Sequence, residues 1–149
     1  MNFRNEKELH RKILEDAKSL GIHLIDMKKG VFDLLLDSKI PRIIELKMIE
    51  HDFRINVDDN YGFEFDENKT SETREMKNQE LIPFVIAYDR EIKDERRFYF
   101  ITNSELKRAM HAENRDDYSK IIFNRVERDH IFRNPITYEE VLAKLKSLT

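Results

Sequence analysis

Apolar residues recur along the chain with two periods, and these periods predict where helices and strands lie. The segment KELHRKILEDAKSLG, residues 7–21, has the helical period, which places Leu9, Ile13, Ala17 and Leu20 on one face. Gly21 is a typical helix stop. Near the other end of the chain, VLAKLKSL follows a Thr-x-x-Glu capping box and predicts a closing amphipathic helix.

Five shorter apolar runs predict strands. In chain order they are IHLIDM, VFDLLL, PRIIELKMI, PFVIAYD and RRFYFIT. Two further helices are expected at 70–79 and at SELKRAMH, whereas residues 116–134 give no clear pattern. The order α-β-β-β-α-β-β-α-α predicts an α/β (α+β) fold in which helices flank a mixed β-sheet.

The second and third predicted strands form a hairpin whose register can be worked out. A three-residue loop centred on Lys39 places Asp33 directly opposite Glu45. Because side chains alternate along a strand, one face of the hairpin is almost entirely apolar and should face the core. The other face carries Asp33, Glu45 and Lys47 among aliphatic residues.

This pair of carboxylates has two interpretations. Like charges on directly opposed residues destabilise a sheet, but two such carboxylates suit a hard cation such as Mg²⁺. Lys47 would project to the same side, where it could stabilise charge on a phosphate or help to position an attacking water. Alternatively, Asp33 is a solubility residue on an edge strand, and Glu45 with Lys47 is a surface ion pair worth about 0–1 kcal/mol.

Length and composition limit the classes of protein. The 149 residues are expected to form a single domain, residues 1–149. The chain has no cysteine, and no apolar run reaches the roughly 20 residues that span a bilayer. Only three glycines are present, so a phosphate-binding glycine loop is excluded. We expect a cytoplasmic protein that does not contact membranes.

Charge is distributed unevenly around a net value of −3. Residues 50–95 carry 6 basic and 14 acidic side chains, with the densest acid in an insertion at about 50–68. Basic residues are scattered and are candidate phosphate contacts or simply a solvated surface. They are Lys28, Lys29, Lys39, Arg108, Arg115, Lys120, Arg125, Arg128 and Arg133.

The segments FDLLL and IIELKM, with Asp33, Glu45 and Lys47, resemble the motif of the PD-(D/E)XK, or restriction-endonuclease-like, nuclease superfamily. Within that superfamily the sequence is most similar to Holliday junction resolvases, over about residues 5–102. The resemblance implies hydrolysis of DNA phosphodiester bonds that depends on Mg²⁺ (or Mn²⁺). Asp33 and Glu45 would be the metal ligands, and Lys47 would assist the attacking water or the scissile phosphate.

The resemblance adds two further candidates. Glu8 matches the resolvase-type glutamate on the first helix, although its spacing from Asn5 also fits a capping box. Gln79 lies on the predicted helix where related nucleases often place a glutamine, although a single polar residue there is also typical of plain surface.

The sequence therefore predicts a metal-dependent DNA endonuclease that acts on branched or otherwise structured DNA and forms a homodimer. The alternative is a non-catalytic interaction protein with a nuclease fold, whose acidic 50–68 block docks a basic partner.

Overall fold

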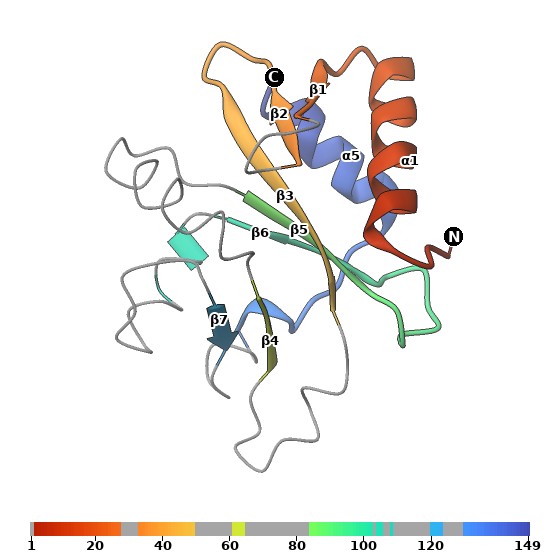
Figure 1. Ribbon diagram of the computed structural model, residues 1–149, viewed down its shortest axis with the longest axis vertical. Coiled ribbons are helices and arrows are strands. Elements are labelled where there is room, and N and C mark those ends of the chain that lie inside the picture. Colours follow the sequence, from red (N-terminus) through yellow and green to blue (C-terminus); the bar gives the residue numbers. More distant parts are fainter. Residues whose placement is uncertain are drawn as a thin grey trace.

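The structure is a computed structural model that describes residues 2–27, 33–49, 84–102 and 130–149, together with Ser104, Glu105, Arg108 and the backbone of residues 61–64 and 120–123. Its main element is a five-stranded sheet of strand order β1-β2-β3-β5-β6 (Figure 1). Neighbouring strands are antiparallel except β3 and β5, which are parallel. The strands are β1 (Leu24–Asp26), β2 (Leu34–Leu36), β3 (Arg42–Ile49), β5 (Phe84–Asp89) and β6 (Phe98–Ile101).

The expected α+β class with a mixed sheet and packed helices is confirmed. A second, two-stranded sheet was not expected: β4 (Tyr61–Glu64), inside the acidic block, pairs with β7 (Lys120–Phe123). The helix expected at 70–79 lies outside the described residues. None of the described helices is long and apolar enough to cross a membrane.

Helix α1 (Glu6–Ser19) follows the predicted period at all but one position. Leu9, Ile13 and Ala17 are fully buried, but Leu20 is 50% exposed, so its expected place on the buried face is wrong. Leu20 is the C-cap residue, where the chain leaves the helical path. The predicted stop at Gly21 is confirmed: its φ of 72° is in the left-handed region that favours glycine, and the Ile22 amide donates to the Ala17 carbonyl at 2.8 Å.

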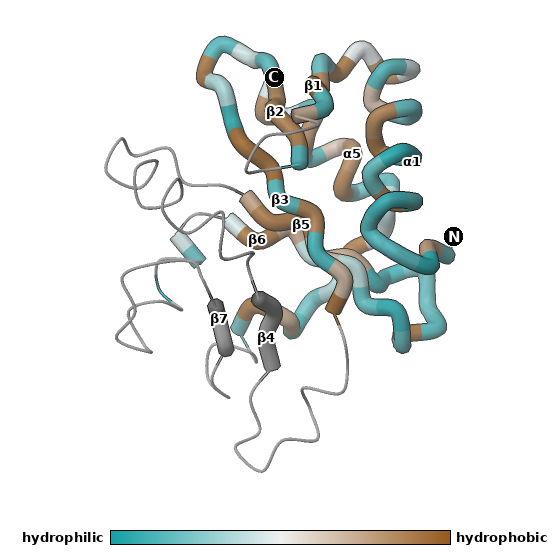
Figure 2. Tube along the Cα trace, viewed as in Figure 1, coloured by the Kyte–Doolittle hydropathy of each residue, from teal (hydrophilic) through white to brown (hydrophobic). Residues whose placement is uncertain are grey.

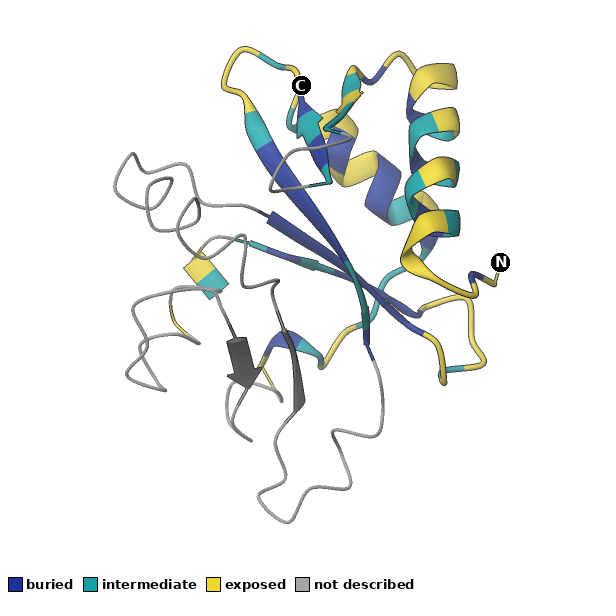
Figure 3. Cartoon of the chain, in the orientation of Figure 1, coloured by how far each residue is buried: buried dark blue, intermediate teal, exposed yellow. Residues whose placement is uncertain are grey.

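Both described helices pack on the same face of the sheet (Figures 1 and 3). The second is α5 (Tyr138–Ser147). The hairpin supplies the core with Leu34, Leu36, Ile44 and Leu46, each at most 1% exposed, as the strand alternation predicted. Figure 2 shows the resulting division, with apolar positions along β3, β5 and β6 and hydrophilic ones along the outer side of α1.

An aromatic cluster ties the N-terminal segment to this core. The ring of Phe3 lies 5.4 Å from that of Tyr88, 6.2 Å from that of Phe98 and 6.1 Å from that of Tyr138, measured between centroids. The Phe3 amide also donates to the Tyr88 hydroxyl at 3.2 Å. Residues from β5, β6 and α5 therefore hold the residues that precede α1.

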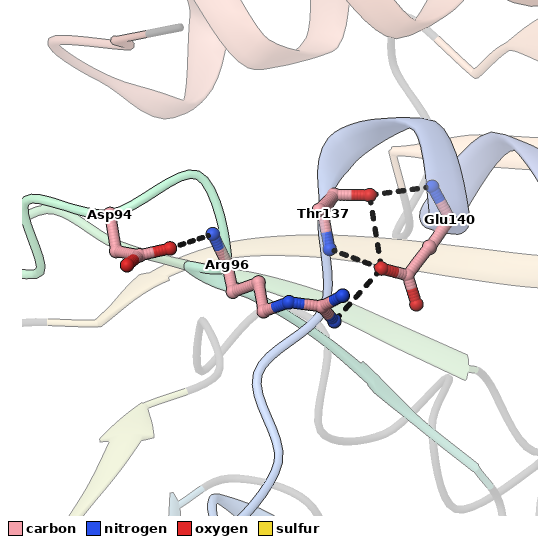
Figure 4. A network of polar contacts seen from close by, with 4 residues as sticks. All are labelled: Asp94, Arg96, Thr137 and Glu140. Carbon is pink, nitrogen blue, oxygen red and sulfur yellow. Dashed lines mark hydrogen bonds and ion pairs between the residues drawn. The ribbon is translucent and has the colours of Figure 1, made fainter.

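The predicted capping box at the start of α5 is confirmed and has an additional partner (Figure 4). The Thr137 hydroxyl accepts from the Glu140 amide at 3.1 Å, and Glu140 Oε1 accepts from the Thr137 amide at 3.4 Å. The same Oε1 accepts from Arg96 Nη1 at 3.0 Å. One carboxylate thus joins the start of α5 to the turn between β5 and β6.

Replacing Thr137 tests the cap. Thr137→Ala removes the hydroxyl that accepts from Glu140, so we expect a loss of about 1 kcal/mol in the free energy of unfolding. That loss corresponds to a melting temperature lower by roughly 3 °C, measured by circular dichroism. Thr149→Ala, at the exposed last residue, is the matched control, and an equal effect from both would contradict the cap.

Candidate active site

The hairpin has the predicted register. Leu34 pairs with Ile44, Leu35 with Ile43 and Leu36 with Arg42. Continued by one residue beyond β2, this register sets Asp33 opposite Glu45. On its other side, the carbonyl of Asp33 accepts from the Met27 amide at 3.1 Å, which extends the pairing of β1 with β2. A backbone hydrogen bond on the β1 side and the hairpin register on the β3 side therefore fix the position of Asp33.

The side chain of Asp33 is bound to β3. Its Oδ2 atom accepts a hydrogen bond of 2.8 Å from the backbone amide of Leu46, the residue after Glu45. The other oxygen, Oδ1, receives no hydrogen bond from the residues that the structure describes. Asp33 is thus oriented through one oxygen while its second oxygen can accept another ligand.

Glu45 and Lys47 lie on β3, which is an inner strand of the sheet. Glu45 is 1% exposed and pairs by register with Val85, and Lys47 is half-buried and pairs with Ala87. Burying a carboxylate costs free energy unless charges or hydrogen bonds compensate it. The interpretation of Glu45 as an exposed member of a surface ion pair is therefore wrong, because its side chain is almost completely removed from solvent.

A cavity of about 710 Å³ lies between α1 and the ends of β1 and β2. Its acidic lining residues are Glu8, Asp26 and Asp33, and its basic ones are Arg4, Lys7 and Arg11. The structure thus brings two sequence-predicted site residues, Glu8 and Asp33, to one cavity. Glu45 and Lys47, although described, do not line it, and Gln79 lies outside the described residues.

Glu8 has a defined partner in this cavity. Its Oε2 accepts from the Arg4 amide at 2.9 Å, and its Oε1 accepts from Arg4 Nε at 2.7 Å. These two hydrogen bonds favour the charged form and lower the pKa of Glu8 below the ordinary 4.5. Asn5 caps α1 by accepting from the Glu8 amide at 2.9 Å, but the Glu8 carboxylate binds Arg4 and not the amide of Asn5, so the capping box is only half formed.

Three polar residues of this region were not singled out from the sequence. His10 Nε2 lies 3.3 Å from Asp26 Oδ1, and both line the cavity with Asp33. Glu6 Oε1 accepts from the Met48 amide at 3.3 Å. Asp26 stands at the end of the run IHLID, where a charged residue closing an apolar strand was the available signal.

The carboxylates of the hairpin are the residues that could hold a metal ion in this region. Among the described residues, no group of three or more His, Asp or Glu side chains could hold a metal ion. Mg²⁺ is typically held by one or two carboxylates, with waters and substrate phosphate oxygens as its other ligands. The strand register sets two carboxylates, Asp33 and Glu45, opposite each other, which is the number of protein ligands that such a site uses.

Comparisons with known proteins give one structural neighbour to report. No family model and no curated protein matches the sequence. Among solved structures, the chain is similar to Hjc, a Holliday junction resolvase from the archaeal hyperthermophile Archaeoglobus fulgidus. The alignment covers 93% of this chain and 95% of that chain, with 12% sequence identity and a TM-score of 0.48. We therefore argue the function from the chain's own residues.

The contacts of Glu8 predict its titration. Because its pKa is lowered in the folded protein, the stabilisation from Glu8 is present above the ordinary carboxyl pKa and is lost as the pH falls through the lowered value. The larger cause is the backbone amide of Arg4, so Arg4→Ala should raise the pKa only part of the way back. Titration of the Glu8 side chain by NMR checks both statements; a wild-type pKa at or above 4.5 would contradict them.

Proposed function

We propose that the chain is a metal-dependent endonuclease that hydrolyses phosphodiester bonds in DNA. The observation that carries this proposal is the Asp33–Leu46 hydrogen bond, which holds one carboxylate against β3 beside the buried Glu45. Lys47 follows two residues later on the same strand, so its side chain projects to the same side as that of Glu45. Two carboxylates and an ammonium group on adjoining strands are a sufficient set for hydrolysis assisted by a divalent cation.

Each residue has a role that its position supports. Asp33 and Glu45 would hold Mg²⁺ or Mn²⁺, which supplies Lewis-acid activation of the phosphate and of water. Lys47 offsets the negative charge that grows on the phosphate oxygens as water attacks phosphorus and the bond to the leaving oxygen breaks. Glu8 lines the same cavity as Asp33, and its lowered pKa favours the charged form, so its proposed role is to orient the attacking water.

The proposed substrate is branched or otherwise structured DNA, and the proposed assembly is a homodimer. A twofold dimer would present two sites, one for each strand. The alternative function, docking of a basic partner by the acidic 50–68 block, has no specific observation in its favour, since only the backbone of β4 is described there.

Metal binding can be measured without activity. At a Mg²⁺ or Mn²⁺ concentration 100 times the dissociation constant, binding to the folded state should stabilise it by about 2.7 kcal/mol, or roughly 5–10 °C in melting temperature. Asp33→Asn should remove this shift, because the amide can still accept from Leu46 but has lost the charge. An unchanged shift in Asp33→Asn would place the metal elsewhere; Glu139→Asn, on the exposed side of α5, is the control.

Cleavage tests the chemistry. We expect the wild type to cut at least one of four-way-junction, duplex and single-stranded DNA in Mg²⁺ or Mn²⁺. Glu45→Gln and Lys47→Ala should each slow cleavage by about 100-fold or more, since each removes a charge at the reacting phosphate. Gel assays with end-labelled strands measure the rates, and Glu139→Gln should cut like the wild type. Full activity in Glu45→Gln would overturn the assignment.

A further inference from the structure

A second cavity, of about 590 Å³, lies on the other side of the N-terminal segment. It is lined by residues 2–4, by Tyr88 and by the turn that joins β5 to β6. This region plays no part in the proposed hydrolysis. Figure 2 shows that the chain is largely hydrophilic along this turn and at the start of α1.

The floor of this cavity contains a buried guanidinium group. Arg97 is only 7% exposed, and its charged carbon lies 4.6 Å from the centre of the Tyr88 ring. Arg97 Nε donates to the Asp89 carbonyl at 3.1 Å, Nη2 donates to the Arg90 carbonyl at 2.8 Å, and Nη1 donates to Asn2 Oδ1. These acceptors are two peptide carbonyls and a side-chain amide, none of which carries a charge.

Among the described residues, the buried guanidinium of Arg97 therefore donates to neutral acceptors and to no carboxylate. A guanidinium has five N–H donors, and the contacts to the described residues use three of them. Neutral acceptors satisfy hydrogen bonds without cancelling the charge, and a buried charge normally has an ionic partner. An anion in the cavity would supply that partner and accept the remaining donors.

The other charged residues in the described lining of this cavity are positive on balance. Arg4, Arg90 and Lys93 add three positive charges to that of Arg97, against the two carboxylates Asp94 and Glu95. The Asp94 carboxylate accepts from the Arg96 amide at 2.9 Å, which fixes the shape of the turn. The described lining therefore has a net positive charge.

The turn is also held in place from outside the cavity. Arg96 Nη1 donates to Glu140 at 3.0 Å, which anchors the turn to the start of α5 (Figure 4). A ligand would therefore meet basic groups that are already positioned, and less ordering free energy is lost on binding.

The two cavities are neighbours. Arg4 lines both of them and binds Glu8 through its backbone amide and its Nε. A group bound in the second cavity would therefore be separated by the side chain of Arg4 from the cavity that Asp33 lines.

We propose that this second cavity binds a phosphate group through Arg97 and Lys93. Arginine suits phosphate because its planar array of donors matches two phosphate oxygens. This proposal has an extension, which rests on the proposed nuclease function. The phosphate belongs to a nucleic-acid strand and flanks the bond that is cleaved.

The experiment compares two exposed lysines, Lys93 at the cavity and Lys18 at the far end of α1, each changed to Gln and to Glu. Inorganic phosphate is titrated against the melting temperature. A fluorescently labelled duplex is titrated by anisotropy in EDTA at several salt concentrations, so that neither metal binding nor cleavage contributes. Lys93 is exposed and outside the core, so these variants should fold like the wild type.

We expect Lys93→Gln to weaken duplex binding by about tenfold and to lower the slope of log affinity against log salt by about one. Lys93→Glu should also abolish the stabilisation by phosphate, while both Lys18 variants bind like the wild type. If phosphate stabilises the protein through Lys93 but duplex binding is unchanged, the cavity takes free phosphate and the nucleic-acid extension is overturned. If the Lys93 and Lys18 variants behave alike with both probes, the phosphate site itself is overturned, whatever the outcome of the cleavage assay.

Discussion

The candidate site depends on side-chain carboxylates that bind the backbone of β3 beyond its pairing with β2. β2 pairs only with the segment Arg42–Ile44 of β3. Beyond it, the amides of Leu46 and Met48 bind carboxylates: Asp33 Oδ2 at 2.8 Å and Glu6 Oε1 at 3.3 Å. An amide removed from water without an acceptor costs about 1–3 kcal/mol, and the Asp33 carboxylate prevents that cost at the part-buried amide of Leu46. The same constraint fixes Asp33 beside Glu45.

The N-terminal segment connects this edge with the second cavity. Phe3 is buried among aromatic residues of the core, and on either side of it Asn2 binds Arg97 while Arg4 binds Glu8. A few residues that precede and begin α1 thus position groups in both cavities. In the proposed function this gives one strand of nucleic acid two adjacent contact points, one where phosphate is hydrolysed and one where phosphate is held.

The parts of the structure that depend on local periodicity could be predicted from the sequence. The hairpin register follows from a period of two and a short loop, which together set Asp33 opposite Glu45. The helical period located Leu9 and Ile13 but misplaced Leu20, because a cap residue no longer follows that period.

Contacts between distant segments could not be predicted in the same way. Arg97 and Asn2 are 95 residues apart, and His10 meets Asp26 across a helix–strand connection. Neither pair leaves a periodic pattern in the sequence. Lys93 and Arg97 are close in the sequence, but the cavity that they line also includes residues 2–4, which no local pattern brings to this turn.

The burial of Phe3 against Tyr88, Phe98 and Tyr138 bears on how the chain matures during translation. Three of these four rings come from β5, β6 and α5, so the packing around Phe3 is complete only after α5 has been synthesised. Contacts of such large sequence separation form slowly, because a long loop has to close first. A nascent chain that stops short of α5 would therefore carry an unfinished aromatic core, without the ring of Tyr138 against Phe3.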